Sequence, residues 1–381
     1  MPEVITEVSP LSPLHFGDGR PFGKSDGAET YARSKQLPSP STLAGFIRTQ
    51  VAKAAGLNMA DKDTLQMLHA LPVYGPLLTL VENSAATYYL PPPKDALVYK
   101  DGSRLQIGAL KPHKGSRGRS NMPNDLAPLA VPKLVKPEPG RPYWSNHELT
   151  RWLAKHEVRL SKEKNWPKED SRVQIAVNGK TGTAQSGMLY TVSYSDYGGS
   201  DHYWTIRARS NLENGLRLSA GYLGGERRPV GVTLYEDLAE SWYDPPNEVK
   251  EAFASFDPKR NLIRMVLATP ALFEHGWKPA WLSKETGSLQ LPRGLANVKL
   301  RLVAAAVGRR EAVSGWNLRT NQPKPVRWAV PAGSVYFFEV AEGDPAAVLK
   351  SWMRPVSDRE QDRKDGFGLA VWGIGGYADE N

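Results

Sequence analysis

A glycine-rich stretch at residues 365–376, with the sequence DGFGLAVWGIGG, restricts the possible folds more strongly than any other part of the chain. Glycine has no Cβ, so a backbone rich in glycine can approach a neighbouring group closely. The apolar residues Leu369 to Trp372 lie between the glycines and predict a buried strand. The residues alone leave two interpretations open: a bulged C-terminal strand of a sheet, or a backbone cradle for a ligand.

The glycine spacing does not match the motifs of nucleotide-binding enzymes. The third glycine of a dinucleotide fingerprint would fall at Val371, and the lysine of a P-loop would fall at Ile374. The Gly-Lys-Thr at 179–181 also fails as a P-loop, because that motif needs glycine where Gln174 stands. We therefore expect no nucleotide cofactor, and the sequence suggests no cofactor of another kind.

The composition favours a basic protein with short strands and long ordered loops. The chain has 381 residues, of which 34 are glycine and 31 are proline, and its length predicts two domains. Lysine and arginine number 49 against 40 for aspartate and glutamate, which gives a formal net charge of +9. A basic protein of this size is expected to meet a polyanion or an acidic surface.

Several classes of protein are excluded by what the sequence lacks. It contains no cysteine, which rules out disulfides, cysteine zinc sites and thiol catalysis. No apolar run approaches the roughly 18 residues of a transmembrane helix, and residues 1–7 lack the pattern of a signal peptide. We therefore expect a cytoplasmic protein. His147-Glu148 is not followed by a histidine at position 151, so the H-E-x-x-H zinc motif is absent.

Hydrophobic periodicity predicts a β-rich mixture of strands and short helices. The predicted strands are 3–9, one or two within 74–89, 172–177, 188–194, 204–209, 262–269, 300–307, 334–340 and the glycine-rich stretch. The predicted helices are 41–56, 61–72, 146–156, a short one after residue 246, and 346–353. Residues 172–194 have the pattern of an extended β-hairpin around a turn at 178–182.

These elements predict an α+β fold with a domain boundary near 245–260. The expected N-terminal domain is 1–250, with two insertions, and the expected C-terminal domain is 251–381. The first insertion, 91–143, is rich in proline and is predicted to be irregular. Its basic residues, which include Lys114 and Arg117, can hold phosphates or belong to a solvated loop.

Six segments, in this order along the chain, resemble one family of proteins. They are 15–23, 38–48, 172–190, 224–228, 330–336 and 366–376. The sequence resembles a RAMP protein of the type III-B CRISPR RNA-guided complexes, specifically subunit three of the Cmr effector. The matching segments spread over nearly the whole chain.

The resemblance implies two RRM-like (ferredoxin-like) domains and a non-catalytic role in antiviral defence. The implied subunit holds the 5′ handle of crRNA and docks on the large polymerase-like Cmr subunit. Its other implied partners are a neighbouring backbone RAMP subunit and, indirectly, the target RNA. The family also has a β-hairpin thumb against guide RNA, which residues 172–194 can form unless they are a sheet edge.

The resemblance implies site residues in the matching segments, to which Lys114 and Arg117 are added as basic residues of the 91–143 insertion. Those expected to bind RNA are Gly366, Phe367, Gly368, Gly373, Gly375, Gly376, Arg48, Arg227, Arg228, Lys114 and Arg117. Those expected at the large-subunit interface are His15, Asp18, Arg20 and Phe22. The family pattern has an arginine before this aspartate, whereas Gly17 stands there. Phe367 and Trp372 are candidates for stacking on bases or for the core.

Two further functions stay open at this point. Some RAMP relatives cut RNA with a histidine and a tyrosine or lysine as general acid and base. His15 and His113 are therefore candidates in a metal-independent endoribonuclease that processes CRISPR repeat RNA. The other alternative is a protein–protein adaptor whose basic charge serves an acidic partner.

Overall fold

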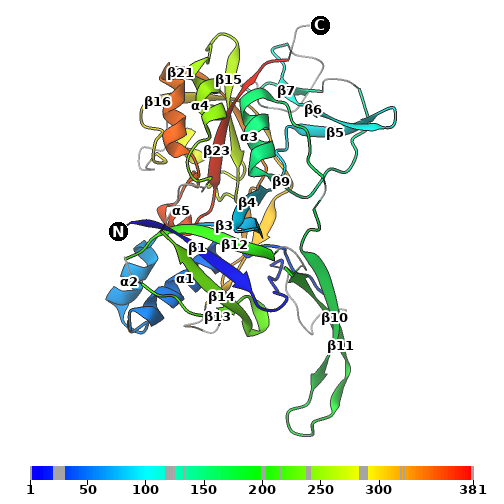
Figure 1. The fold of residues 1–381 in the computed structure, drawn as a ribbon, viewed down its shortest axis with the longest axis vertical. Helices are drawn as coiled ribbons and strands as arrows, with labels where there is room; N and C mark the ends of the chain where they lie inside the picture. Colours follow the sequence, from blue (N-terminus) through cyan, green and yellow to red (C-terminus); the bar gives the residue numbers. More distant parts are fainter. Residues whose placement is uncertain are drawn as a thin grey trace. The chain divides into compact units, whose positions relative to one another are not determined.

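The computed structural model describes residues 2–19, 31–115, 123, 125–131, 134–162, 164–198, 203–213, 216–236, 242–282, 291–317, 320 and 322–378. The chain forms two compact units, and each unit is assembled from three segments (Figure 1). Unit 1 comprises 1–86, 164–237 and 312–327, and unit 2 comprises 87–163, 238–311 and 328–381.

Unit 1 is built on a sheet with the strand order β13-β14-β1-β12-β3. These strands are β1 (Glu3–Pro10), β3 (Val73–Glu82), β12 (Tyr203–Asn211), β13 (Gly221–Leu223) and β14 (Arg228–Tyr235). β1 is antiparallel to both neighbours, so that Glu7 lies opposite Arg207 and Thr233. Helix α1 (Pro40–Ala54) packs on β3 and β13 and is followed by α2 (Lys62–Ala70).

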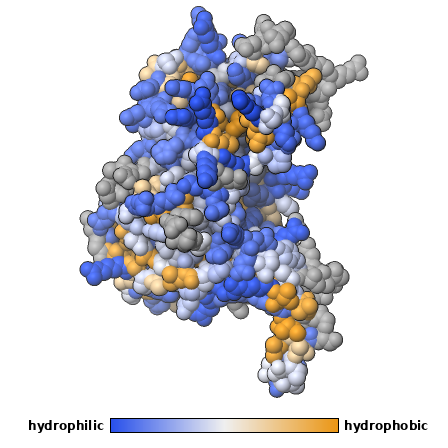
Figure 2. Space-filling view, turned by 45° about the vertical axis from the view of Figure 1, so that its right-hand side comes forward, coloured by the Kyte–Doolittle hydropathy of each residue, from blue (hydrophilic) through white to orange (hydrophobic). Residues whose placement is uncertain are grey.

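A long hairpin extends from unit 1. It consists of β10 (Lys168–Val177) and β11 (Ala184–Asp196), and the short β2 (Tyr31–Ala32) pairs with β11 (Figure 1). One face of the hairpin is apolar, as Figure 2 shows. Its exposed apolar side chains are Val173, Ile175, Val177 and Leu189. The hairpin predicted from the sequence is therefore present.

Unit 2 contains a second sheet, with the strand order β16-β21-β15-β23-β22. The strands are β15 (Asn261–Leu267), β16 (Val298–Ala306), β21 (Val335–Gly343), β22 (Arg354–Pro355) and β23 (Leu369–Gly376). Helices α3 (Asn146–Lys155) and α4 (Asn247–Ala254) pack on β23. A short helix, α5 (Glu360–Lys364), precedes β23.

The remaining elements are short. The paired strands are β4 (Ala85–Leu90) with β9 (Trp144–Ser145), β5 (Ala96–Asp101) with β6 (Arg104–Ala109), β7 (Lys111–Pro112) with β8 (Leu129–Ala130), β17 (Glu311–Val313) with β20 (Arg327–Ala329), and β18 (Trp316–Asn317) with β19 (Gln322–Pro323). The 3₁₀ helices are η1 (Gly225–Arg227), η2 (Ala280–Leu282) and η3 (Pro345–Ser351). None of the helices in the described ranges is long and apolar enough to cross a membrane.

The two main helices begin where the sequence supplies capping residues. Ser39 caps α1 by accepting a hydrogen bond from the Thr42 backbone, and Pro40 takes the first helical position. Ser145 and Glu148 form a reciprocal capping box at the start of α3. Both helices then bury one apolar face, which fixes them against their sheets.

The glycine-rich stretch ends in β23, between β15 and β22, and its apolar residues from Leu369 to Trp372 are fully buried. The predicted buried strand is thus confirmed. Its ladder with β15 is unbroken from Gly376 to Ala370, so the expected bulge is absent there. A Cβ at Gly373 would lie 2.8 Å from the Leu153 Cα, which means that glycine allows α3 to approach the strand closely.

A charged network is buried inside unit 2. Arg264 of β15 is fully buried and donates to the Asp95 carboxylate at 2.6 Å and to the Ile374 carbonyl at 2.9 Å. The Trp152 indole donates to the same carboxylate at 2.9 Å. His156 ends α3 in the left-handed conformation, with φ of 55°, and its Nε2 lies 3.7 Å from Asp95. This network joins α3, β15 and β23.

The structure confirms the α+β class, with mostly sheets and few helices. It differs from the prediction in two places. Residues 96–109 form the β5–β6 hairpin, although 91–143 was expected to be irregular; a tight turn at Gly102, with φ of 61°, makes this possible. The predicted helix 346–353 is the 3₁₀ helix η3, with backbone bonds such as Trp352 to Leu349 that span three residues.

The predicted domains, 1–250 and 251–381, stay a prediction. The two units divide the chain differently, because residues 87–163 belong to unit 2 and residues 312–327 to unit 1. Three separate segments in each unit mean that a single cut in the chain does not separate them.

Candidate nucleic-acid interface

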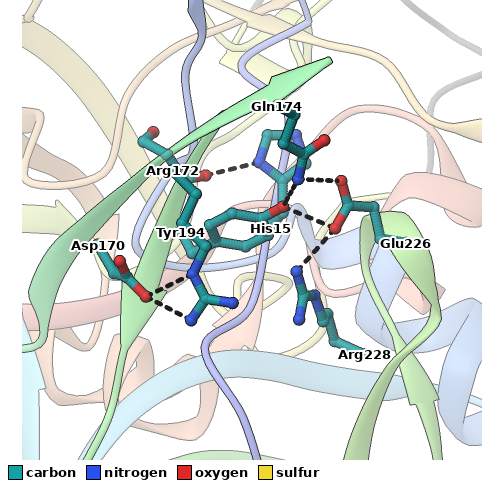
Figure 3. Close-up of polar contacts among 8 residues, drawn as sticks. His15, Asp170, Arg172, Gln174, Tyr194, Glu226 and Arg228 are labelled. Carbon is teal, nitrogen blue, oxygen red and sulfur yellow. Dashed lines mark hydrogen bonds and ion pairs between the residues drawn. The ribbon is translucent and has the colours of Figure 1, made fainter. Parts of the chain in front are cut away.

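Tyr194 of β11 is the centre of a polar cluster where the hairpin joins unit 1 (Figure 3). The residue is fully buried. The guanidinium carbon of Arg172, on β10, lies 5.1 Å from the centroid of the tyrosine ring. That of Arg228, at the start of β14, lies 4.4 Å from the same centroid. These distances are typical of cation–π contacts, so one ring orients two arginines from different elements.

Glu226 joins the hairpin to the turn before β14. Its carboxylate accepts hydrogen bonds from the Tyr194 hydroxyl at 2.6 Å, from Arg228 at 2.8 Å and from Gln174 at 3.2 Å (Figure 3). Burial acts to raise the pKa of Glu226, but these hydrogen bonds together outweigh burial and hold the pKa below its ordinary value. The carboxylate is therefore ionised at neutral pH and positions all three donors.

His15 packs against the same cluster from the N-terminal loop. Its Nδ1 lies 2.8 Å from the Ser193 carbonyl oxygen, and its ring meets the Tyr194 ring edge-on at 5.9 Å (Figure 3). The backbone N–H of Gly225 donates to the His15 carbonyl at 2.9 Å. A Cβ at Gly225 would lie 2.9 Å from the imidazole, and Gly224 has φ of 78°. The two glycines thus permit the loop and the turn to touch.

The arginines of this region differ in whether an acidic side chain pairs with them. Arg172 forms an ion pair with Asp170 at 2.6 Å, and Arg228 forms one with Glu226. Arg227 is exposed and has no ion pair with any residue in the described part of the chain. Its guanidinium carbon lies 4.9 Å from the ring centroid of Tyr222, which is 56% exposed.

We call Arg172, Tyr194, Tyr222, Glu226, Arg227 and Arg228 the arginine–tyrosine cluster. Guanidinium groups bind phosphates through two parallel N–H donors, and they stack on planar groups. Tyrosine rings and guanidinium planes also stack on unpaired bases. The arrangement therefore suits the backbone and bases of a single-stranded nucleic acid.

Among the residues predicted from the sequence, the structure brings His15, Arg227 and Arg228 together at this cluster. Asp18 is half-buried on the same N-terminal loop as His15. The predicted residues Arg20, Phe22 and Arg117 lie outside the described residues.

Two predicted arginine and lysine contacts lie elsewhere. Arg48 is only 7% exposed, and its guanidinium donates to the Leu71 carbonyl at 2.8 Å and 3.1 Å, at the end of α2. Lys114 lies in unit 2, where its ammonium is 4.5 Å from the ring centroid of Tyr377. Arg48 therefore lies outside the arginine–tyrosine cluster, and contact of Lys114 with RNA stays a prediction.

The predicted glycine motif lies in the core of unit 2. Phe367 is 2% exposed and Trp372 is fully buried, and the Trp372 indole donates to the Ser351 carbonyl at 3.2 Å. A Cβ at Gly368 would lie 2.7 Å from the Ser357 hydroxyl. The aromatic rings thus serve the core, as one of the two sequence interpretations had it. RNA contact by the motif's glycines, Gly366, Gly368, Gly373, Gly375 and Gly376, stays a prediction.

Four members of the arginine–tyrosine cluster were missed at the sequence level: Arg172, Tyr194, Tyr222 and Glu226. Alternation along β10 places Asp170, Arg172 and Gln174 on one face of the hairpin. That pattern was a usable signal. The role of Tyr194 could not be predicted from the sequence, because that role depends on the strand register that places Tyr194 opposite Asp170.

The described residues hold no group of three or more histidine, aspartate or glutamate side chains that could bind a metal ion. His113, one of the two candidate catalytic histidines, accepts a hydrogen bond from the Gly115 backbone through Nδ1 at 2.8 Å. That hydrogen bond gives His113 a structural role within its own turn.

The structure thus combines an α+β scaffold with a cluster of arginine and tyrosine side chains, which are residue types that nucleic-acid interfaces use. The chain belongs to the Cas_Cmr3 family of CRISPR-associated proteins, whose family model matches residues 6–375. This match confirms the resemblance to subunit three of the type III-B Cmr complex and places the protein in CRISPR antiviral defence.

Two solved structures are similar to this chain. One is a chain of the type III-B Cmr-beta complex bound to cognate target RNA, with 16% identity and a TM-score of 0.46. The other belongs to the same kind of complex bound to target RNA and AMPPnP, with 16% identity and a TM-score of 0.42. Each match covers 87% of this chain and 86% of the other. No curated protein matched the sequence.

Proposed function

We propose that the protein is a non-catalytic subunit that binds the 5′ handle of crRNA through the arginine–tyrosine cluster. The observation that supports this most directly is the convergence of Arg172, Arg227 and Arg228 on the rings of Tyr194 and Tyr222. Arginines held on aromatic rings need little further ordering to meet phosphates and unpaired bases.

The strand order of both units supports the proposed RRM-like domains. In chain order, the unit 1 strands β1, β3, β12 and β14 lie as 4-1-3-2 across the sheet. The unit 2 strands β15, β16, β21 and β23 follow the same order. This is the arrangement of the ferredoxin-like motif, whose four-stranded sheet serves RNA binding in RRM domains.

Salt dependence tests the RNA contacts. On single-stranded RNA, each phosphate that the protein neutralises contributes about 0.7 to the slope of log affinity against log salt. We expect Arg227→Gln to reduce this slope by about that amount and to weaken handle binding, measured by fluorescence anisotropy. The matched control is Arg260→Gln, whose side chain is 87% exposed and paired with Asp257. An unchanged slope in Arg227→Gln would remove this residue from the site.

The loop at 15–23 is the proposed docking segment for the large polymerase-like subunit. His15 is shared between this loop and the cluster, so docking and handle binding would involve neighbouring residues. Hydrogen exchange of the amides from His15 to Gly19 should slow when the two subunits are mixed. Exchange that stays the same would mean that the loop does not dock there.

We also propose that the β10–β11 hairpin is the thumb, which contacts guide RNA beside a neighbouring backbone RAMP subunit. Between Val173 and Thr191, Lys180 is the single charged residue. The exposed apolar row would therefore meet bases or apolar protein surface rather than phosphates.

One observation favours the alternative of a metal-independent endoribonuclease: His15 lies beside Tyr194. Burial, and then the hydrogen bond to Glu226, raise the pKa of Tyr194, which makes its hydroxyl a poorer acid at neutral pH. Incubating the protein with CRISPR repeat RNA in EDTA distinguishes the two functions. Products that end in 2′,3′-cyclic phosphate and disappear in His15→Ala would establish the nuclease.

A further inference from the structure

Unit 2 carries an exposed tryptophan with an arginine stacked on it. Trp328, in β20, is 52% exposed. The guanidinium carbon of Arg310, directly before β17, lies 4.2 Å from the Trp328 ring centroid. The residue keeps about half of its surface exposed although the guanidinium already covers part of it. A second planar group can therefore stack on the remaining surface.

Two further basic residues lie near Arg310, since Arg309 precedes it in the chain and Lys94 packs close to Gly308. Arg309 and Arg310 are both exposed, and Lys94 is exposed beside them, since a Cβ at Gly308 would lie 3.3 Å from its Cε. In the described part of the chain, none of these three cations is in an ion pair. Glu311 is the neighbouring acid along the chain; burial and, secondly, the charge of Glu311 raise the pKa of the buried Tyr143.

The loops that carry these cations are fixed by hydrogen bonds and close packing. The Lys94 backbone donates to the Gly333 carbonyl at 2.8 Å, and Gly333 has φ of 80°. The Gly308 backbone donates to the Ser334 hydroxyl at 3.4 Å. A Cβ at Gly308 would lie 2.8 Å from the Pro331 ring. The side chains are thus presented from anchored turns, which lowers the entropic cost of binding.

We infer that Lys94, Arg309, Arg310 and Trp328 form a second binding surface, which takes a single-stranded RNA segment by stacking one base on Trp328 and pairing the adjacent phosphates with the cations. Base–aromatic stacking with basic side chains along the backbone is how proteins bind single strands without reading sequence. This inference rests on the proposed RNA-binding function, but it assigns a different surface from the arginine–tyrosine cluster.

The test uses the full chain and a fluorescein-labelled oligouridine 15-mer, with binding followed by anisotropy. Trp328→Ala should weaken binding about tenfold, whereas Trp328→Phe should retain most of the affinity because a ring remains. Arg310→Gln should reduce the salt slope by about 0.7. The matched controls are Trp316→Ala, at an equally exposed tryptophan of unit 1, and Arg260→Gln; both should bind like the wild type.

A second measurement does not depend on any variant being folded. Photocrosslinking of the wild-type chain to 5-iodouridine RNA should label the peptide that contains Trp328. The absence of that crosslink, or equal affinities of Trp328→Ala and Trp316→Ala, would overturn the inference. If Arg227→Gln weakens binding and Trp328→Ala does not, the proposed function stands and this inference alone fails. If the wild type binds no RNA, both fail.

Discussion

Tyr194 contacts different residues with the ring and with the hydroxyl of its side chain. The ring holds the guanidinium groups of Arg172 and Arg228, while the hydroxyl donates to Glu226. The hydroxyl contact orders the turn, and the ring contact orders the cations that are proposed to meet RNA. The two contributions can be separated by substitution.

We expect Tyr194→Phe to bind handle RNA within about threefold of the wild type, because the ring remains. Its free energy of unfolding should fall by about 1–3 kcal/mol, because the substitution removes two hydrogen bonds, one to Glu226 and one from Gln174. Tyr194→Ala should weaken RNA binding about tenfold or more, because it removes the stacking surface for both arginines. Equal affinities of the two variants, measured by anisotropy, would mean that the ring does not orient the site.

At the same scale, the sequence predicted residues that follow local patterns and missed those that depend on pairing. Arg227 and Arg228 follow two glycines in a turn, and His15 lies in a glycine-rich loop, so local composition indicated them. Tyr194 and Glu226 are 32 positions apart and meet only because β11 and the turn before β14 lie together. Phosphate binding by Arg48 stays a prediction, and two N–H donors of its guanidinium bond the Leu71 carbonyl at the end of α2.

At the scale of elements, β23 shows that glycines in a strand also serve close packing inside the protein. Its glycines permit close approach, as the sequence indicated, and the groups that approach include the α3 backbone and Arg264. The glycine pattern predicts that another group approaches the strand closely, but it does not predict which group that is. That identity is set by the packing of α3, about 220 residues earlier in the chain.

We expect Gly373→Ala to destabilise the protein by about 1–3 kcal/mol, because its new methyl group would overlap the Leu153 backbone. Gly376→Ala is the control on the same strand, since the nearest group to its Cβ would be the Arg260 carbonyl at 3.5 Å, an ordinary contact. Urea denaturation measures both variants. Equal midpoints for the two would contradict the packing explanation.

At the scale of the whole molecule, the buried network of unit 2 predicts how stability depends on pH. Burial, and then the charge of Arg264, lower the pKa of His156 to about 4, although Asp95 acts in the opposite direction. The unfolded chain has an ordinary histidine pKa of about 6.5 and therefore binds more protons between pH 4 and 6.5. The contribution of His156 to the free energy of unfolding is therefore complete above pH 6.5. It decreases as the pH falls, by at most about 1.4 kcal/mol per pH unit.

We expect the wild type to lose about 1–2 kcal/mol more stability than His156→Asn between pH 7 and pH 5. Asparagine is the suitable replacement, because it tolerates the left-handed conformation of residue 156. Urea unfolding at the two pH values gives the difference. Parallel losses in the two proteins would show that His156 does not titrate on unfolding.

In unit 1, the strands that pair with β1 are synthesised long after β1 itself. β1 is completed at Pro10, but its partners β12 and β14 begin only at Tyr203 and Arg228. At about 5–20 residues per second, the ribosome delivers them roughly 10–40 s later. During that interval β1 has both edges open, and its Glu3 and Glu7, which later pair with arginines of β12, supply charges that disfavour pairing with other nascent chains.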